Sequence, residues 1–362
     1  MTSNHILIYA GFFIVTLLIS FLLNGLLLRF AQSLGIRNAS EVMRWSTQQK
    51  PALGGIPFFL VFLLSISCYA VFFPYRVTPM DTRLLGIIAA VSLAFIMGLA
   101  DDSYNTRPIL KFGVQVLCGV ILIMTDLYIK FFSIPELNYA FTILWVVGMM
   151  NSFNMLDNMD AITATVSIFV LMTSLMIIVI HQDYFNQDVL VILGITGALV
   201  GFLFYNWHPS KMYMGDTGSQ FLGILLAIFG IKYMWNSSDM SGQFIASKQF
   251  ISVALAFILP LSDTTTVVIN RLLKRKSPFI GGRDHTTHYL SYLGLSDSQV
   301  ALAFCGISVV SMLLVLVIQT GIQNWGWKHI IIFALYILMV FGTLYAVTRL
   351  TRPPKKDEKS DN

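Results

Sequence analysis

Eleven long apolar segments dominate this chain and limit what it can fold into. They alternate with short polar stretches over almost all of its 362 residues. Each segment supplies about the 17–25 residues that a helix needs to cross the hydrocarbon core of a bilayer. The pattern predicts an all-α integral membrane protein with about 11 transmembrane helices. The expected spans are 6–29, 54–74, 83–100, 108–125, 139–155, 161–181, 188–206, 218–235, 250–272, 297–320 and 329–348.

Composition supports this prediction and argues against a soluble chain. Hydrophobic residues make up 56% of the sequence and charged residues 11%, whereas a soluble globular protein carries roughly 25% charged residues. The net charge of +5 does not indicate nucleic-acid binding, because the basic residues are spread over the loops. Cys68, Cys118 and Cys305 each lie within an apolar run. Their spacing favours buried thiols over a zinc site or a disulfide framework.

The basic residues predict the orientation of the chain. With these spans, 17 of the 23 Lys and Arg residues lie on one side, and the positive-inside rule assigns that side to the cytoplasm. The N-terminus is therefore expected outside and the C-terminus in the cytoplasm. A single membrane domain is predicted over residues 1–348, followed by a polar, disordered tail at 349–362. The six basic residues on the other side are Arg76, Arg83, Lys130, Lys232, Lys248 and Lys328.

Six aspartates gather on the predicted cytoplasmic side, in four separate loops. One Asp at a helix end is readily explained as a cap, but six on one face indicate a functional site, because charges near membrane depth are costly. The adjacent pair would repel and so favour a cation. Mg²⁺ takes oxygen ligands and commonly keeps substrate phosphates among them. The six residues are Asp101, Asp102, Asp157, Asp160, Asp216 and Asp284.

Polar side chains recur every third residue where the fifth span ends, at Asn151, Asn154, Asp157 and Asp160. In a regular α-helix this spacing drifts by about 60° per step, since a turn holds 3.6 residues. A 3₁₀ turn would align the four groups in one row. A broken or tightened helix end would therefore direct amide and carboxylate oxygens at one ligand.

The segment Met214–Ser219 lies between two predicted spans and is rich in small residues. Small residues allow the backbone to approach a phosphate, and a helix that begins near Gly218 would present free N–H groups. Asp216 in this segment is a candidate metal ligand.

Asp263 lies inside the ninth predicted span, where it indicates either a proton relay or a polar helix contact. No catalytic role is assigned to it.

The largest predicted cytoplasmic loop contains Arg283, His285 and His288 after a pair of glycines. Arginine and histidine suit the binding of an anion. The glycines would allow this loop to fold over a substrate. A solvated loop without a ligand is the alternative at this point.

Five short motifs together resemble the polyprenyl-phosphate N-acetylhexosamine-1-phosphate transferases, of the glycosyltransferase family 4 type. The resemblance covers about residues 45–295, with the motifs in the family's order and spacing. It implies attack of polyprenyl phosphate on the β-phosphate of a UDP-N-acetylhexosamine, with Mg²⁺ as cofactor and Mn²⁺ as an alternative ion. The motifs are KPALGG at 50–55, GLADD at 98–102, NSFNMLDNMDA at 151–161, MGDTGS at 214–219 and RDHTTH at 283–288.

The resemblance also implies roles for individual residues. Asp216 resembles the principal metal ligand and Asn154 a second one. Asp101 resembles the base that prepares the lipid phosphate, with Asp102 beside it, and Asp157 and Asp160 resemble residues of the nucleotide-sugar site. These four acids are the catalytic candidates. The substrate-binding candidates are Lys111, Asn151, Arg283, His285 and His288.

Departures from the family pattern bear on the sugar. Thr287 replaces the middle histidine of a His-x-His-His signature, and the consecutive histidines of the branch that acts on UDP-MurNAc-pentapeptide are absent. UDP-GlcNAc is therefore favoured, with a phospho-MurNAc-pentapeptide transferase as the alternative. Asn158 and Ala161 replace glycines common in the family, which leaves the sugar open. From another class, a polytopic transporter would also use intramembrane acids, but here the acids gather at one face.

The expected partners are the UDP-sugar, polyprenyl phosphate and membrane lipid, without nucleic acid, and a homodimer is left open. The expected location is the bacterial plasma membrane, with the active site on its cytoplasmic face.

Overall fold

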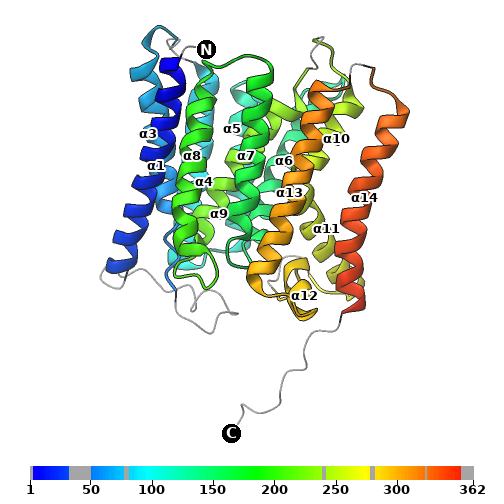
Figure 1. Ribbon diagram of the computed structural model, residues 1–362. Helices are drawn as coiled ribbons and strands as arrows, with labels where there is room; N and C mark the ends of the chain where they lie inside the picture. The colour runs from blue at the N-terminus through cyan, green and yellow to red at the C-terminus, as the bar shows by residue number, and fades with distance from the viewer. Residues whose placement is uncertain are drawn as a thin grey trace.

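The computed structural model describes residues 3–31, 50–76, 81–238, 242–277, 282–322 and 324–351, and within these ranges its regular elements are helices, joined by loops and turns and by one isolated β-bridge between Ala52 and Tyr213 (Figure 1). The first half contains α1 (Ser3–Phe30), α3 (Gly55–Phe72), η1 (Pro74–Arg76), α4 (Thr82–Tyr104), α5 (Pro108–Met124), α6 (Pro135–Leu156) and α7 (Ile162–Ile180). The second half contains α8 (Gln187–Asn206), α9 (Gly215–Gly230), η2 (Ile231–Trp235), α10 (Ala246–Ala256), α11 (Ile258–Leu273), α12 (Thr286–Tyr292), α13 (Asp297–Thr320) and α14 (Trp327–Leu350).

The predicted all-α membrane fold is confirmed. Nine helices in the described ranges are long and apolar enough to cross a membrane, and a tenth candidate is the pair α10 and α11, whose axes differ by 79°. The remaining predicted segment forms α5, a shorter apolar helix of 17 residues. Each of the eleven predicted segments thus forms helix, while the number of crossings stays a prediction.

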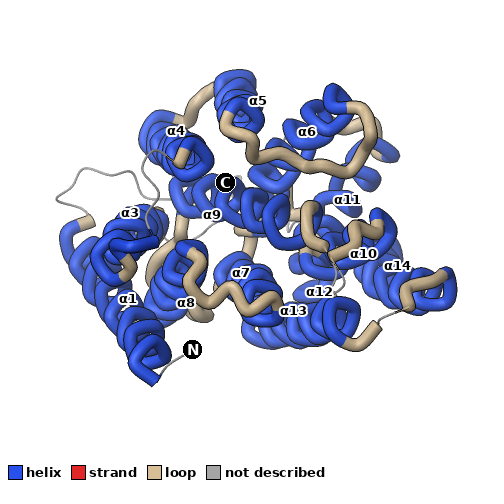
Figure 2. The backbone as a smooth tube through the Cα atoms, turned by 90° about the horizontal axis from the view of Figure 1, so that it is seen from above, coloured by secondary structure: helices blue, strands red, loops and turns tan. Residues whose placement is uncertain are grey.

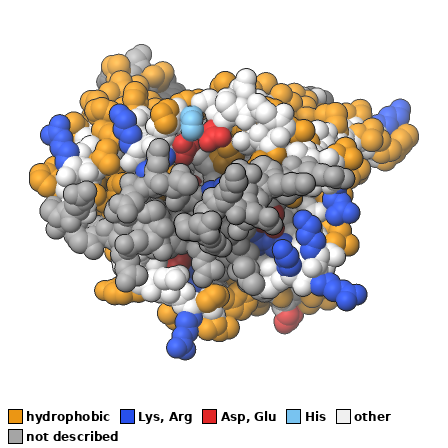
Figure 3. All heavy atoms as spheres, turned by 90° about the horizontal axis from the view of Figure 1, so that it is seen from below, with side chains coloured by type: hydrophobic (Ala, Val, Ile, Leu, Met, Phe, Trp, Pro, Cys, Tyr) orange, Lys and Arg blue, Asp and Glu red, His pale blue; other side chains and the backbone are white. Residues whose placement is uncertain are grey.

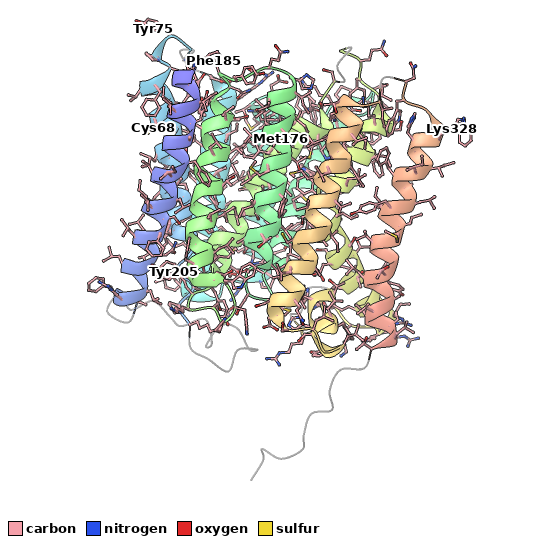
Figure 4. All side chains as sticks on the ribbon, in the orientation of Figure 1. Cys68, Tyr75, Met176, Phe185, Tyr205 and Lys328 are labelled. Carbon is pink, nitrogen blue, oxygen red and sulfur yellow. The ribbon has the colours of Figure 1, made fainter. Side chains whose placement is uncertain are left out.

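The two ends of the bundle are distinct. Helix α1 begins at one end and α14 finishes at the other, beside the short helix α12 (Figure 1). We refer to the second end as the α12 end. Tyr205 lies near the α12 end, whereas Lys328, Phe185 and Tyr75 lie near the opposite end (Figure 4). This arrangement agrees with the predicted topology in which the two termini face opposite sides.

Helix α9 forms the centre of the bundle, with α3, α4, α6, α7 and α8 around it (Figure 2). In the most apolar stretch of α9 and η2, 89% of the residues are buried, whereas the corresponding share in α14, at the margin of the bundle, is 17%. The outer helices expose large apolar side chains such as Leu7 and Leu338, as lipid-facing helices do. The central position of α9 matters because its first turn carries Asp216.

Local sequence signals account for several helix ends. The Asp81 side chain accepts a hydrogen bond from the backbone N–H of Arg83 at 3.0 Å and so caps α4. Ser296 and Gln299 form a capping box at the start of α13. Proline opens both α5 and α6, where its missing N–H costs nothing.

Helix boundaries near the motifs differ from the expectations. Helix α6 stays regular through Leu156, so the tightened helix end proposed for the 151–160 segment is absent there. Helix α9 begins at Gly215, earlier than expected, and α12 occupies part of the predicted loop that follows residue 283. Helix α14 continues to Leu350, two residues into the predicted tail, and the tail from 352 onward lies outside the described residues.

Candidate active site

Four helices bring predicted site residues together near the α12 end of the bundle. Asp101 and Asp102 lie in the last turns of α4, Lys111 in the first turn of α5, Asn154 in the last turn of α6, and Asp216 in the first turn of α9. Helices α4 and α9 touch backbone to backbone at Gly98, where an added Cβ would lie 2.4 Å from the carbonyl oxygen of Asp216. Seen from this end, a histidine shows beside acidic side chains in the upper part of the view, and several Lys and Arg side chains project at the margin of the face (Figure 3).

Lys111 contacts three other residues of this group. Its Nζ lies 3.1 Å from Asp101 Oδ2 and 3.5 Å from Asn154 Oδ1, and it also forms an ion pair with Asp216 Oδ2. Asn154 Nδ2 donates to Asp216 Oδ1 at 2.8 Å and to Ser219 Oγ at 2.9 Å. We call Asp101, Lys111, Asn154 and Asp216 the acid–lysine centre. Two carboxylates here share one ammonium group, which leaves a net negative charge.

The donor set of the acid–lysine centre fits a hard divalent ion. Carboxylate oxygens of Asp101 and Asp216 and the amide oxygen of Asn154 converge on the position held by the ammonium group of Lys111. Mg²⁺ prefers such oxygen ligands and completes its shell with water or substrate phosphate. Lys111 therefore marks where a cation is stabilised, and the three oxygen-bearing side chains are the candidate ligands.

Asp102 has different surroundings from its neighbour Asp101. Its Oδ1 accepts the backbone N–H of Asp216 at 2.9 Å, and its Oδ2 accepts the backbone N–H and the hydroxyl of Thr217 at 2.8 Å and 2.6 Å. A carboxylate at this place satisfies free N–H groups at the N-terminus of α9 and complements the helix dipole. These contacts support a positioning role for Asp102 toward Asp216 rather than the catalytic role suggested by the sequence.

Asp160 belongs to a second cluster, apart from Lys111. It is buried and accepts hydrogen bonds from the backbone N–H of Ser210 at 3.1 Å and the hydroxyl of Ser210 at 2.7 Å, while His208 Nδ1 lies 3.0 Å away. Lys50 Nζ donates to Ser210 Oγ at 3.0 Å. Asp160, His208 and Asp297 present potential metal-ligand atoms within 4.8 Å of one another.

The side chains of Asn151 and Asn154 have different neighbours because α6 is a regular helix between them. Asp157 lies just beyond the end of this helix. Asp157 caps the C-terminus of α6. Burial and the negative charge of Asp216 raise the pKa of Asp157 to about 8. The Asn151 amide instead donates to Gln115 Oε1 at 2.7 Å and to the Val147 carbonyl at 2.8 Å. Asn151 therefore takes part in helix packing, and these contacts do not support its predicted role as a substrate ligand.

The segment before α12 is held by two residues of α11. Arg271 binds Asp284 with two parallel hydrogen bonds, at 2.7 Å from Nε and 2.6 Å from the guanidinium terminus. Asp263 accepts hydrogen bonds from His285 Nδ1 at 2.8 Å and from the Thr286 N–H at 2.8 Å. We call these five residues the loop anchor. Although burial opposes it, Arg271 holds the pKa of Asp284 below its ordinary value.

The loop anchor brings the remaining predicted residues to the same end of the bundle. Thr287 donates a hydrogen bond to Asn158 Oδ1, which joins α12 to the turn after α6. His288 lies next to His285, with ring centroids 5.8 Å apart, and burial is the main cause that lowers the pKa of His288 to about 4. Its Nδ1 is buried without a hydrogen-bond partner among the described residues. Arg283 is exposed in front of α12.

Comparisons with known proteins agree with the motif resemblance. Residues 84–234 match the model of glycosyl transferase family 4. The chain is also 26% identical over 349 residues to the probable undecaprenyl-phosphate N-acetylglucosaminyl 1-phosphate transferase of Bacillus subtilis, which covers 92% of this chain and 90% of that protein. The match to glycosyl transferase family 4 lies in the central part of the chain, and the similarity to the B. subtilis protein extends over most of it. The matched range carries the whole acid–lysine centre.

Two further relatives with different names are similar over shorter lengths. The phospho-N-acetylmuramoyl-pentapeptide-transferase of Streptococcus uberis is 33% identical over 200 residues, which is 50% of this chain and 58% of that protein. The decaprenyl-phosphate N-acetylglucosaminephosphotransferase of Mycolicibacterium smegmatis is 24% identical over 246 residues, 61% of this chain and 60% of that protein. All three relatives are sugar-phosphate transferases by name.

Sequence reasoning missed several residues of this site. His208 and Ser210 contact Asp160 but lie in a short turn that carries no motif of its own. Their position seven and five residues before Gly215 was an available signal. Asp263 was noticed but left without a role, because its partners lie in a loop more than 20 residues away. A cavity of about 640 Å³ at the other end of the bundle, lined by Arg83, Asp188 and Lys232 among others, contains none of the predicted residues.

Proposed function

We propose that this protein transfers N-acetylglucosamine 1-phosphate from UDP-GlcNAc to undecaprenyl phosphate, releasing UMP. The observation that carries the proposal is the acid–lysine centre, in which oxygen ligands and a lysine meet at one end of a membrane bundle. A site at the membrane surface is where a lipid phosphate and a water-soluble nucleotide sugar can meet. The similarity over 92% of the chain to a protein of the same named activity supports it.

The reaction joins two anionic phosphates, so charge compensation is its main requirement. An oxygen of the lipid phosphate forms a bond to the β-phosphorus of the UDP-sugar. The bond from that phosphorus to the oxygen bridging to the α-phosphorus breaks, and UMP leaves with the electron pair. When bound by Asp216 and Asn154, Mg²⁺ would neutralise phosphate charge at this centre.

The side chains of the chain itself have separable tasks in this proposal. Asp101 accepts the proton of the lipid phosphate, and Thr106 holds its other oxygen through a backbone N–H at 2.9 Å. Lys111 moves from its carboxylate partners to phosphate oxygens and supports the charge that develops there. Asp102 keeps the first turn of α9 in place. Asp157 and Asp160 face the nucleotide part of the donor.

A direct test uses purified protein with undecaprenyl phosphate and a panel of UDP-sugars at controlled Mg²⁺. Release of UMP with UDP-GlcNAc, abolished by chelation and restored by Mg²⁺, is the expected result. Mn²⁺ in place of Mg²⁺ tests the choice of ion. Transfer from UDP-MurNAc-pentapeptide alone would instead assign the chain to the pentapeptide branch, which the partial similarity to the S. uberis protein favours. No UMP from any sugar would contradict the proposal.

We place the active site on the cytoplasmic face of a bacterial plasma membrane, because 17 of the 23 basic residues lie on the α12 side in the predicted topology. A phosphatase fused after the C-terminus is expected to be inactive, and the same enzyme fused in the loop before α8 is expected to be active. Activity of the C-terminal fusion would reverse the orientation.

A further inference from the structure

Asp263 is an acidic side chain inside a membrane-spanning segment, and the proposed reaction gives it no task. It lies in α11, the second half of the bent span, and is only 1% exposed. An ionised carboxylate at that depth is costly unless it is fully hydrogen-bonded. Its Oδ1 accepts both the backbone N–H and the hydroxyl of Thr286, at 2.8 Å and 2.6 Å. Its Oδ2 faces His285 Nδ1 at 2.8 Å.

These contacts determine how the His285 ring is protonated at one nitrogen. A carboxylate oxygen only accepts hydrogen bonds, so Nδ1 must carry the proton that is shared with Asp263. The other ring nitrogen, Nε2, then becomes the atom through which His285 can meet a ligand. Among the described residues, Nε2 has no hydrogen-bond partner. A carboxylate that fixes the tautomer of a histidine in this way is a known device in catalytic sites.

His285 lies in a part of the chain that is joined to the turn after α6. His288 lies beside His285, and its own Nδ1 is buried without a partner in the described ranges. Thr287, which lies between the two histidines in the sequence, donates a hydrogen bond to Asn158 in the turn that carries Asp157. Two histidine rings with unpaired nitrogens therefore border the region assigned to the nucleotide sugar. Asp284, the residue before His285, is held separately by its ion pair with Arg271.

We infer that Asp263 is a positioning residue, which holds His285 with Nδ1–H toward α11 and leaves Nε2, which carries a lone pair, to accept a hydrogen bond from an N–H or hydroxyl group of the nucleotide sugar. The inference rests on the proposed function for the identity of that ligand. The pairing of Asp263 with His285 itself does not depend on it. The intramembrane acid thus acts on the reaction through a loop histidine, and neither proton transport nor metal binding is required of it.

Asp263→Asn is the informative substitution because it replaces one oxygen of the carboxylate with an NH₂ group and keeps the other oxygen. The amide oxygen can keep both hydrogen bonds from Thr286, and the amide NH₂ then faces His285. The ring must present a lone pair at Nδ1 and move its proton to Nε2. The matched control is Thr286→Val, which removes a hydroxyl donor to Asp263 but leaves the contact with His285 and the backbone N–H bond in place.

The tautomer can be read without any transfer reaction. The protein has 6 histidines, and ¹⁵N-histidine NMR spectra of the purified protein, assigned by comparison with His285→Gln, report which ring nitrogen of His285 carries the proton. We expect protonated Nδ1 in the unchanged protein and in Thr286→Val, and a proton on Nε2 in Asp263→Asn. Addition of UDP-GlcNAc without lipid acceptor should shift the Nε2 resonance. An unchanged tautomer in Asp263→Asn, or an Nε2 resonance insensitive to UDP-GlcNAc, overturns the inference.

Kinetics provide the second measurement. Asp263→Asn should lower kcat by about 100-fold or more, the scale of a misplaced proton-transfer or hydrogen-bonding group, with KM for UDP-GlcNAc within a few-fold. Thr286→Val should cost no more than about tenfold. Equal losses in both variants would mean that Asp263 merely anchors the loop, and the inference would fail. An unchanged protein that transfers no sugar contradicts the proposed function, while the NMR spectra still decide whether Asp263 orients His285.

Discussion

The acid–lysine centre and the loop anchor lie at the same end of the bundle, but their carboxylates are bonded differently. In the acid–lysine centre, Asp101 and Asp216 share one ammonium group. In the loop anchor, Asp263 receives three hydrogen bonds and Asp284 two from a guanidinium. Two carboxylates that share one ammonium group keep a net negative charge that attracts another cation, whereas each acid of the loop anchor has donors that it does not share with a second acid. The difference separates residues that bind from residues that position.

The largest effect should follow from removing a carboxylate of the acid–lysine centre. Asp216→Ala takes away the principal candidate metal ligand and the partner of both Lys111 and Asn154. We expect kcat to fall by about 1000-fold or more, since an electrostatic group at the reacting phosphates is lost. UMP release over a Mg²⁺ series measures this loss, and a detergent thermal-melting profile verifies that the variant folds. Turnover equal to the unchanged protein at low Mg²⁺ would remove Asp216 from metal binding.

A smaller effect is expected for Arg283, which is exposed at the edge of the loop anchor. Arg283→Lys keeps the charge but loses the forked donor geometry that suits phosphate oxygens. Loss of one charge-assisted hydrogen bond, about 1.5–3 kcal/mol, should lower kcat/KM for UDP-GlcNAc by about 10- to 100-fold. Arg349→Lys, at an exposed position near the end of α14, is the matched control. Equal kinetics for the two variants would leave Arg283 with a purely topological role.

The adjacent pair at the end of α4 tests the comparison most sharply. Asp102→Asn has one acceptor oxygen for three donors on α9 and loses the charge that complements its N-terminus. We expect a loss of about 1–3 kcal/mol in stability, seen as a lower melting temperature, with about a tenfold loss in kcat. Asp101→Asn should show the reverse, with a larger loss in kcat and little change in melting temperature. Similar behaviour of the two variants would contradict their separate roles.

The smallest effect is expected at Asn151, which lies outside both centres. Asn151→Leu removes its hydrogen bond to Gln115 and should reduce stability by about 1 kcal/mol, as for one internal hydrogen bond. The kinetic constants for UDP-GlcNAc should stay within about threefold, because Asn151 bonds to Gln115 and Val147 and not to the acid–lysine centre. A threefold change corresponds to less than about 1 kcal/mol in the activation free energy. An increase in KM well beyond that range would restore Asn151 as a substrate ligand.

The apolar runs were sufficient to predict the membrane fold, because a bilayer allows few other structures for such segments. The positions of the acids predicted the end of the bundle where the site lies. The roles within adjacent or equally spaced residues could not be predicted in the same way. Asp101 and Asp102 are chemically identical and neighbouring, and only the packing of α9 against Gly98 distinguishes them.

Helix geometry did contain part of the answer for the 151–160 segment. A regular helix separates side chains at three-residue spacing by about 60°, and Asn151 and Asn154 indeed bond to different neighbours, Gln115 and Asp216. The tightened turn is not seen between Asn151 and Leu156, where α6 is regular, but the helix does end inside the segment, before Asp157. For Asp263 no local pattern was available. Its partners His285 and Thr286 reach it only because α11 packs beside α12.

The bend between α10 and α11 also has a consequence for the fit of the protein to lipid. Residues 246–273 would extend over about 42 Å as one straight helix, well beyond the roughly 30 Å of hydrocarbon in a typical bilayer. Joined at 79°, the two helices reach only about 32 Å from end to end. The bend therefore brings an overlong segment to the thickness of the membrane without tilting its neighbours, and any change that straightened it would create a hydrophobic mismatch of about 10 Å.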